Sequence, residues 1–214
     1  MTYNWSKLSQ VEPKFTVFFD HDIEYEATEY AIEKIRSGRN GSCILNALTS
    51  EMTPNNALTI MVDVNSNSEA GGELTLSQSK RYGLNLGDDG YIDKVKHLVK
   101  NNIPIKPVIY YNPINAVVSD RHNKSYLIRD EERAFISLAH ELIHAFHLMK
   151  GTSKSEGIDR THDVTSTQIE EEERAVGIGK YQGALFSENG VREDHGIRLR
   201  ASYFTKDLTG NKEP

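Results

Sequence analysis

The stretch 134–150, AFISLAHELIHAFHLMK, contains the pattern H-E-x-x-H over His140–His144. On an α-helix, the four-residue spacing places both imidazoles on one face about one turn apart, where they can bind a single zinc ion. Glu141 stands next to the first histidine, where its carboxylate can take a proton from a metal-bound water. The other residues are mostly apolar, so the stretch predicts a buried helix that directs a few polar groups inward.

Both ends of this stretch carry helix signals. The acidic run 130–132 suits the N-terminal end of a helix dipole, and Gly151 follows Lys150 as a stop. Two unpaired imidazoles and a carboxylate would be costly to bury without a metal or hydrogen-bond partners. We therefore expect a metal site and not an accidental H-E-x-x-H in an ordinary core helix.

Length and composition indicate one globular catalytic domain. The chain has 214 residues, of which 37% are hydrophobic and 26% charged. We expect the domain to cover 14–207, with a loosely ordered segment at 1–13 and a flexible tail at 208–214. No apolar run is long enough to span a bilayer, and the N-terminus lacks the features of a secretory signal peptide. These features predict a cytosolic protein or one exported without a cleavable signal.

Charge and cysteine content narrow the expected partners. The net charge is −6 and the basic residues are scattered, which argues against a nucleic-acid partner and favours a protein or peptide. The one cysteine, Cys43, excludes an intramolecular disulfide and a thiolate metal cluster. We expect no membrane partner and a monomer.

The fold class predicted from the hydrophobic pattern is α+β, with a small mixed sheet. The pattern predicts strands at 15–19, 58–64, 73–76 and 108–111, helices at 24–37 and 41–50, a loop at 65–72 and irregular structure at 77–93. The strand at 108–111 is expected to lie along the substrate cleft as an edge strand, where an extended peptide could pair with it. Asp20, His21 and Asp22 are interpreted as a surface turn in preference to a metal cluster.

A catalytic zinc usually has three protein ligands, so a third must lie outside the H-E-x-x-H pattern. The residues after His144 lack the Gly and third His of the longer pattern H-E-x-x-H-x-x-G-x-x-H. His147 is expected to support the ligands or to pack, because three ligands on one straight helix can hardly converge on one ion.

The acidic run 170–173 is the other source of ligands. If Ile169 and Val176 face the core, Glu172 and Glu173 lie on the same side, while Glu170 and Glu171 point outward. A solvated acidic face is the ordinary interpretation of such a run. His162 and Asp163 remain rival ligands.

Four motifs together resemble the NleD-like family of type III secreted zinc proteases and, more distantly, the catalytic light chains of the clostridial neurotoxins. They are HELIHAFH at 140–147, EEERAVG at 171–177, FSENGVR at 186–192 and RLRASY at 198–203, and IRSGRNG at 35–41 is also similar to the family. The resemblance implies a zincin-like fold of the gluzincin type, in which the second glutamate of the downstream helix, Glu172, is the third zinc ligand. It also implies that Arg200 and Tyr203 match the R-x-x-Y element near the site.

The expected activity is zinc endopeptidase, with Glu141 as the general base, Arg200 and Tyr203 stabilising the oxyanion and Glu171 orienting a zinc-bound imidazole. The resemblance implies injection into a host cell by a type III route and cleavage of mitogen-activated protein kinases in the activation loop. Two alternatives stay open. One is a zinc endopeptidase toxin with another protein target, and the other is a non-catalytic binding module with a structural zinc.

Overall fold

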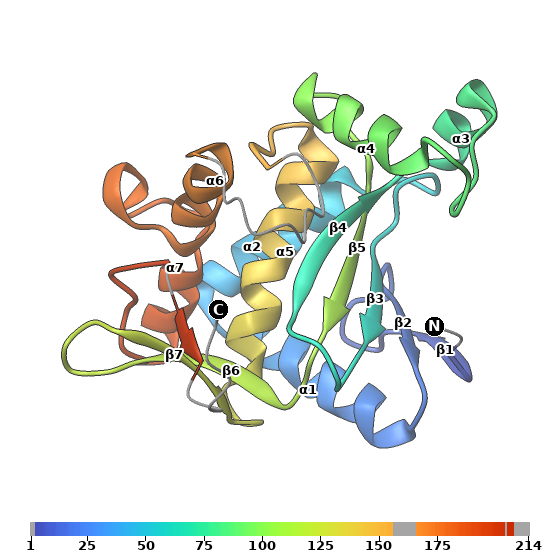
Figure 1. Cartoon of the computed structure of the whole chain (residues 1–214). Helices are drawn as coiled ribbons and strands as arrows, with labels where there is room; N and C mark the ends of the chain where they lie inside the picture. The colour runs from blue at the N-terminus through green and yellow to red at the C-terminus, as the bar shows by residue number, and fades with distance from the viewer. Residues whose placement is uncertain (1–2, 156–165, 204, 208–214) are drawn as a thin grey trace.

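A five-stranded mixed sheet forms one side of the molecule. The structure is a computed structural model that describes residues 3–155, 166–203 and 205–207 (Figure 1). The strand order is β1-β2-β3-β5-β4, with β2, β3 and β5 parallel and the two edge strands antiparallel to their neighbours. The strands are β1 (Trp5–Leu8), β2 (Thr16–Phe19), β3 (Thr59–Val62), β4 (Glu69–Glu73) and β5 (Lys106–Tyr111).

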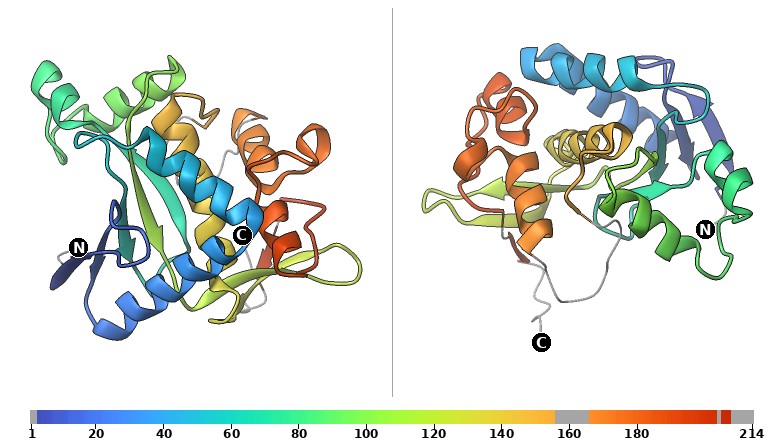
Figure 2. Two further views of the ribbon diagram at one scale, coloured as in Figure 1. Left: turned by 180° about the vertical axis from the view of Figure 1, so that it is seen from behind. Right: turned by 90° about the horizontal axis from the view of Figure 1, so that it is seen from above.

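Helix α5 (Ala134–Lys150) lies at the centre of the fold. It packs on β4 and β5, on α1 (Asp22–Ser37) and on α2 (Arg39–Glu51). Helices α6 (Ser166–Val176) and α7 (Glu188–Asp194) lie on the side of α5 away from the sheet (Figure 2). Because α5 is enclosed by these elements, most of its side chains are buried, including both histidines of the H-E-x-x-H pattern.

Two smaller units complete the fold. A second sheet pairs β6 (Asn115–Ser119) with β7 (Ser125–Arg129) in a hairpin, and β8 (Thr205–Asp207) runs parallel to β7. Helices α3 (Leu76–Tyr82) and α4 (Tyr91–Lys100) form a projection, residues 76–103, which we call the α3–α4 lobe (Figure 1). A short 3-10 helix, η1 (Gly179–Tyr181), follows α6. No helix within the described ranges is long and apolar enough to cross a membrane.

Several predictions from the sequence are confirmed. The strongly apolar helix at 134–150 has the predicted bounds, and the predicted strands at 15–19, 58–64 and 108–111 correspond to β2, β3 and β5. The predicted helices at 24–37 and 41–50 correspond to α1 and α2, and the downstream helix that carries the acidic run 170–173 corresponds to α6. Asp20 and His21 form a bend, and Asp22 begins α1, where His21 is the N-cap of a capping box with Glu24.

The prediction of the edge strand was wrong. The strand next to the site is β4, which pairs with the outer side of β5, so β5 lies inside the sheet. The sequence predicts a loop over most of β4 because residues 69–72 are polar and rich in glycine. Their glycines fit the sheet instead, since a Cβ at Gly72 would collide with the Ile105 side chain.

Two other segments are more ordered than predicted. Trp5–Leu8, within the segment expected to be loosely ordered, pairs with β2, and the Tyr25 hydroxyl donates a hydrogen bond to the Leu8 carbonyl at 2.9 Å. The region 77–93, predicted to be irregular, contains most of α3 and the start of α4. Helix α3 begins with a capping box between Thr75 and Gln78. This pattern is present in the sequence, but the glycines nearby indicated irregular structure.

The IRSGRNG stretch at 35–41, where α1 ends and α2 begins, is hydrogen-bonded to α7. The carboxylate of Asp194 accepts hydrogen bonds from the backbone N–H groups of Asn40 and Gly41, at 2.7 and 3.1 Å, and from the Asn40 side chain at 2.9 Å. A Cβ at Gly38 would collide with that carboxylate. The Asp194 contacts therefore fix the position of α7 relative to α2.

Candidate metal centre

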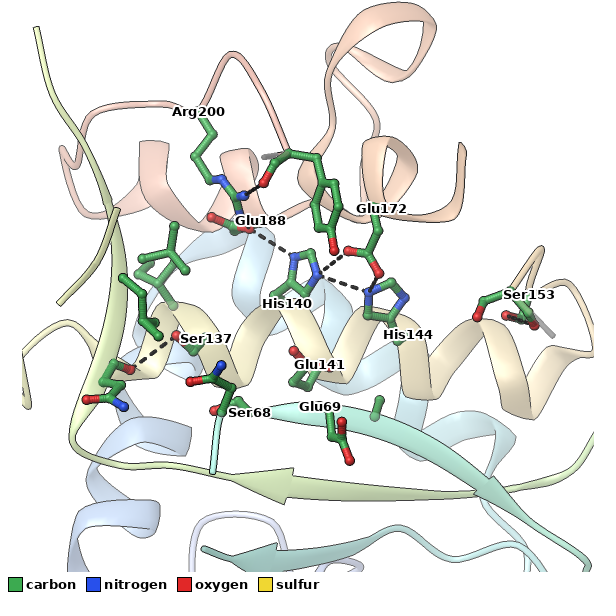
Figure 3. Close-up of a pocket in the computed structure, with 18 of the residues that line it drawn as sticks. Ser68, Glu69, Ser137, His140, Glu141, His144, Ser153, Glu172, Glu188 and Arg200 are labelled. Carbon is green, nitrogen blue, oxygen red and sulfur yellow. Dashed lines mark hydrogen bonds and ion pairs between the residues drawn. The ribbon is translucent and has the colours of Figure 1, made fainter. Parts of the chain in front are cut away.

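Helices α5 and α6 bring three potential metal ligands together. Within the described residues, His140 and His144 on α5 and Glu172 on α6 form a group whose ligand atoms lie within 4.8 Å of one another. The two histidine Nε2 atoms are 3.0 Å apart, and Glu172 oxygens lie 3.0 Å from Nε2 of His140 and 3.4 Å from Nε2 of His144 (Figure 3). Four tetrahedral ligands around zinc at about 2.0–2.1 Å are separated by about 3.4 Å, so these distances fit one zinc ion.

The donor set also favours a cation. Nδ1 of each imidazole faces a buried carboxylate, Glu188 for His140 and Glu171 for His144, so each ring can donate its Nδ1–H and direct its Nε2 lone pair at one cation. Burial lowers the pKa of His140, but the carboxylates of Glu172 and Glu188 raise it to about 9. This buried, electron-rich cluster has the composition of a divalent-metal site.

Glu141 lies beside this cluster at the cleft. Its side chain is buried, and burial raises its pKa, while the nearby histidines lower it. A hydrogen bond from the backbone of Ala70 on β4 also lowers the pKa of Glu141. A carboxylate with a raised pKa beside a metal site is suited to accepting a proton during hydrolysis.

Glu171 faces inward, which corrects the prediction that it points outward. It is fully buried, and its Oε1 atom lies 3.2 Å from Nδ1 of His144 and 2.5 Å from Nδ1 of His147. Burial raises the pKa of Glu171, but hydrogen bonds to these two histidines hold it well below its usual range. Glu171 and Glu172 both face α5, whereas Glu173 is absent from the clusters found in the described residues.

His147 does not reach the group formed by His140, His144 and Glu172. It joins a second cluster with His144 and Glu171, which shares a histidine with the first and therefore belongs to the same centre. The rival ligands His162 and Asp163 lie outside the described residues.

Glu188 is the residue that sequence reasoning missed. Its carboxylate is buried at the N-terminal end of α7 and lies 2.9 Å from Nδ1 of His140. It also accepts hydrogen bonds from Nε of Arg192 at 2.6 Å and Nη1 of Arg200 at 2.8 Å. The FSENGVR motif contains it, and Ser187 before it has the character of an N-cap, which was the available signal.

Arg200 and Tyr203 lie at the same cavity as the metal cluster. The Arg200 side chain is buried, paired with Glu188, and donates to the backbone carbonyl of Tyr203. Burial and the charge of Glu172 raise the pKa of Tyr203 to about 12. The phenol therefore keeps its proton near neutral pH and can act as a hydrogen-bond donor.

The cavity over the metal cluster has a volume of about 320 Å³. Ala70 and Glu69 of β4 form part of its wall, as labelled for Glu69 in Figure 3. Near the start of α5 it is lined by Val117, Leu127 and Ile136, and near the end of α5 by Leu148, Ser153 and Ser155. The cluster is thus at the bottom of an open cleft with an edge strand in its wall, an arrangement that can hold an extended chain.

Comparison with known proteins gives a family match and a fold match. The sequence profile of Peptidase_M91, described as effector protein, matches residues 21–203. The catalytic domain of Clostridium botulinum neurotoxin serotype F is similar in structure, with a TM-score of 0.50 and 13% identity over 87% of this chain and 68% of that domain. The botulinum neurotoxin serotype HA light chain has a TM-score of 0.47 and 15% identity over 82% of this chain and 49% of its own length. No curated protein sequence matches the chain.

Proposed function

Because the chain belongs to the Peptidase_M91 family of effector proteins and is a metalloendopeptidase, we propose that His140, His144 and Glu172 hold one catalytic zinc ion in a site of the gluzincin type. The observation that carries this proposal is the 3.0–3.4 Å separation among the three ligand atoms, at the bottom of a cleft that also contains Glu141. A bound zinc supplies Lewis acidity and lowers the pKa of water toward about 7.

Glu141 is the general base. It accepts the proton of the attacking water and passes it to the leaving amine, a role for which its burial and raised pKa are suited. Ala70, whose backbone hydrogen-bonds to Glu141, restrains the carboxylate at the cleft. Proton transfer of this kind typically contributes about 10²- to 10⁴-fold in rate.

Arg200 and Tyr203 stabilise the oxyanion that forms when the peptide carbonyl is attacked. The phenol of Tyr203 keeps its proton, and Arg200 carries a permanent charge at the wall of the same cavity. Glu188 holds Arg200 and the Nδ1 side of His140, while Glu171 holds His144 and His147. These carboxylates orient the catalytic groups without touching the substrate.

The proposed substrate is a host signalling protein, a mitogen-activated protein kinase cut in its activation loop. The support is the family match to effector proteins together with the sequence motifs that resemble the NleD-like family. Delivery by a type III secretion route, action in the host cytoplasm, a monomeric state and a single domain over 14–207 are further parts of this proposal. The alternatives are a different protein target or a binding module with structural zinc, and the buried, cleft-facing Glu141 argues against the binding module.

The test is intact-mass analysis of purified stress-activated mitogen-activated protein kinases after incubation with the zinc-loaded chain. We expect one specific cut, absent when Glu141→Gln replaces the parent at equal zinc content. A cut that persists in Glu141→Gln would contradict the assigned mechanism. If none of the kinases is cut, the kinase target is withdrawn. Mapping of new protein termini across host proteins would then test whether the chain has peptidase activity.

A further inference from the structure

The α3–α4 lobe is built onto the end of the active-site cleft. It has its own small core, and Leu148 of α5 belongs to that core while also lining the cleft. The backbone N–H of Ile105 donates to the Leu148 carbonyl at 3.2 Å, and the Gln78 side chain donates to the Pro104 carbonyl at 2.9 Å. The α3–α4 lobe therefore lies beside the C-terminal end of α5 (Figure 1), where Leu148 lines the cleft.

The lobe carries a large share of the exposed hydrophobic side chains of the described residues. Ten large hydrophobic side chains are exposed in the described residues, and four of them lie within 76–103. Leu86 is 70% exposed, in a stretch where Gly87 and Gly90 have positive φ and open space on the side where a Cβ would stand. Leu76, Ile92 and Ile103 are 60%, 51% and 38% exposed. Exposed apolar side chains gathered on one projection favour a role for it in binding.

The lobe also differs from the rest of the chain in charge. Residues 76–103 contain five Lys or Arg and three Asp, whereas the whole chain has a net charge of −6. The Arg81 guanidinium and the Lys94 ammonium both lie over the Tyr82 ring, 5.6 and 4.6 Å from its centroid. Lys80, also exposed, precedes Arg81 on α3. Basic side chains thus surround Tyr82 close in sequence to Leu86.

We propose that the α3–α4 lobe is a docking surface for the protein substrate, binding a substrate segment in which acidic side chains stand next to aliphatic ones. This inference rests on the proposed endopeptidase function. The positive charge selects an acidic partner, and Leu86 with the other exposed apolar side chains of the lobe supplies the apolar contact. A docking surface outside the cleft selects a folded protein over a short peptide that has the same cleavage site.

The test compares two variants that change charge and leucine content equally. The lobe variant is Lys80→Glu, Arg81→Glu and Leu86→Ser. The control is Arg121→Glu, Lys124→Glu and Leu185→Ser, which alters exposed positions outside the lobe. Both are made in zinc-loaded Glu141→Gln protein, and binding to a purified stress-activated kinase is measured at about 50 and about 300 mM salt.

We expect the lobe variant to raise Kd about tenfold and to lose most of the salt dependence, and the control to stay within about twofold of the parent. With Glu141 intact, the lobe variant should cut a short activation-loop peptide at the parental rate, which also shows that it folds, and the intact kinase about tenfold more slowly. Equal effects of both variants, or none, would overturn the proposal.

If the parent neither binds nor cuts the kinase, the kinase target fails. The same pair of variants is then compared for binding to β-casein, an acidic protein with exposed aliphatic side chains. A selective loss of binding in the lobe variant would still support docking at the lobe. Equal binding, or no binding by the parent, would overturn it.

Discussion

Replacing Glu188 by glutamine should destabilise the fold and weaken metal binding together. Its carboxylate faces two buried guanidinium groups, Arg192 at 2.6 Å and Arg200 at 2.8 Å. The Arg192 side chain is 1% exposed and that of Arg200 4% exposed, so neither can recover its hydration. Removing one partner of a buried ion pair costs about 3–5 kcal/mol, and the glutamine oxygen still accepts one hydrogen bond. We therefore expect a loss of about 3 kcal/mol, a large part of a typical unfolding free energy of roughly 5–15 kcal/mol.

The assay is urea unfolding of the zinc-free chain, which separates fold stability from metal affinity. Zinc affinity is then measured by competition with a chromophoric chelator. It should fall about 10- to 100-fold because the amide supports Nδ1 of His140 less well than a carboxylate. The control is Glu193→Gln, an exposed position on the same helix, with an expected change below about 0.5 kcal/mol. An unfolding free energy for Glu188→Gln within about 1 kcal/mol of the parent would refute the reasoning.

The other predictions concern the metal, its third ligand and the attachment of α7. Chelation should lower the melting temperature, and zinc at about 1,000 times Kd should restore about 4 kcal/mol of stability in a calorimetric titration. Mass spectrometry of the native protein should show that Glu172→Gln no longer binds zinc stoichiometrically while Glu173→Gln still does. The reverse result would assign the third ligand to Glu173. Asp194→Ala should cost about 2–3 kcal/mol in urea unfolding, because three donors lose their acceptor, and a loss no larger than that of an exposed substitution would contradict this.

Much of the fold could be predicted where the sequence pattern is strong and local. The apolar helix at 134–150 has the expected bounds because its stripe, its acidic start and Gly151 all indicate the same element. Strands β2, β3 and β5 are short, branched or aromatic, and buried, so their type was clear. Strand β4 was missed because Gly72 is required by close packing on Ile105, a contact that local propensity does not record.

The residues of the site could likewise be predicted where the sequence pattern is local, and could not be predicted where their positions depend on packing between helices. The spacing of His140 and His144 predicts their common face, and the structure brings Glu172 to them from another helix. Helical periodicity directs Glu171 outward if Ile169 and Val176 are the core-facing positions of the helix. Its burial depends on two imidazole partners that only the packing of α6 on α5 provides. Glu188 could not be assigned for a similar reason, since His140 lies on α5 and Arg200 lies beyond the end of α7, and only the packing of the fold brings them to it.

The central claim is that one zinc ion is bound by His140, His144 and Glu172. The most direct measurement is an anomalous difference map at the zinc absorption edge from crystals of the zinc-loaded chain. We predict a single peak about 2.0–2.2 Å from Nε2 of each histidine and from one carboxylate oxygen of Glu172. A peak between His147 and Glu171, or no peak in protein that contains stoichiometric zinc, would contradict the account.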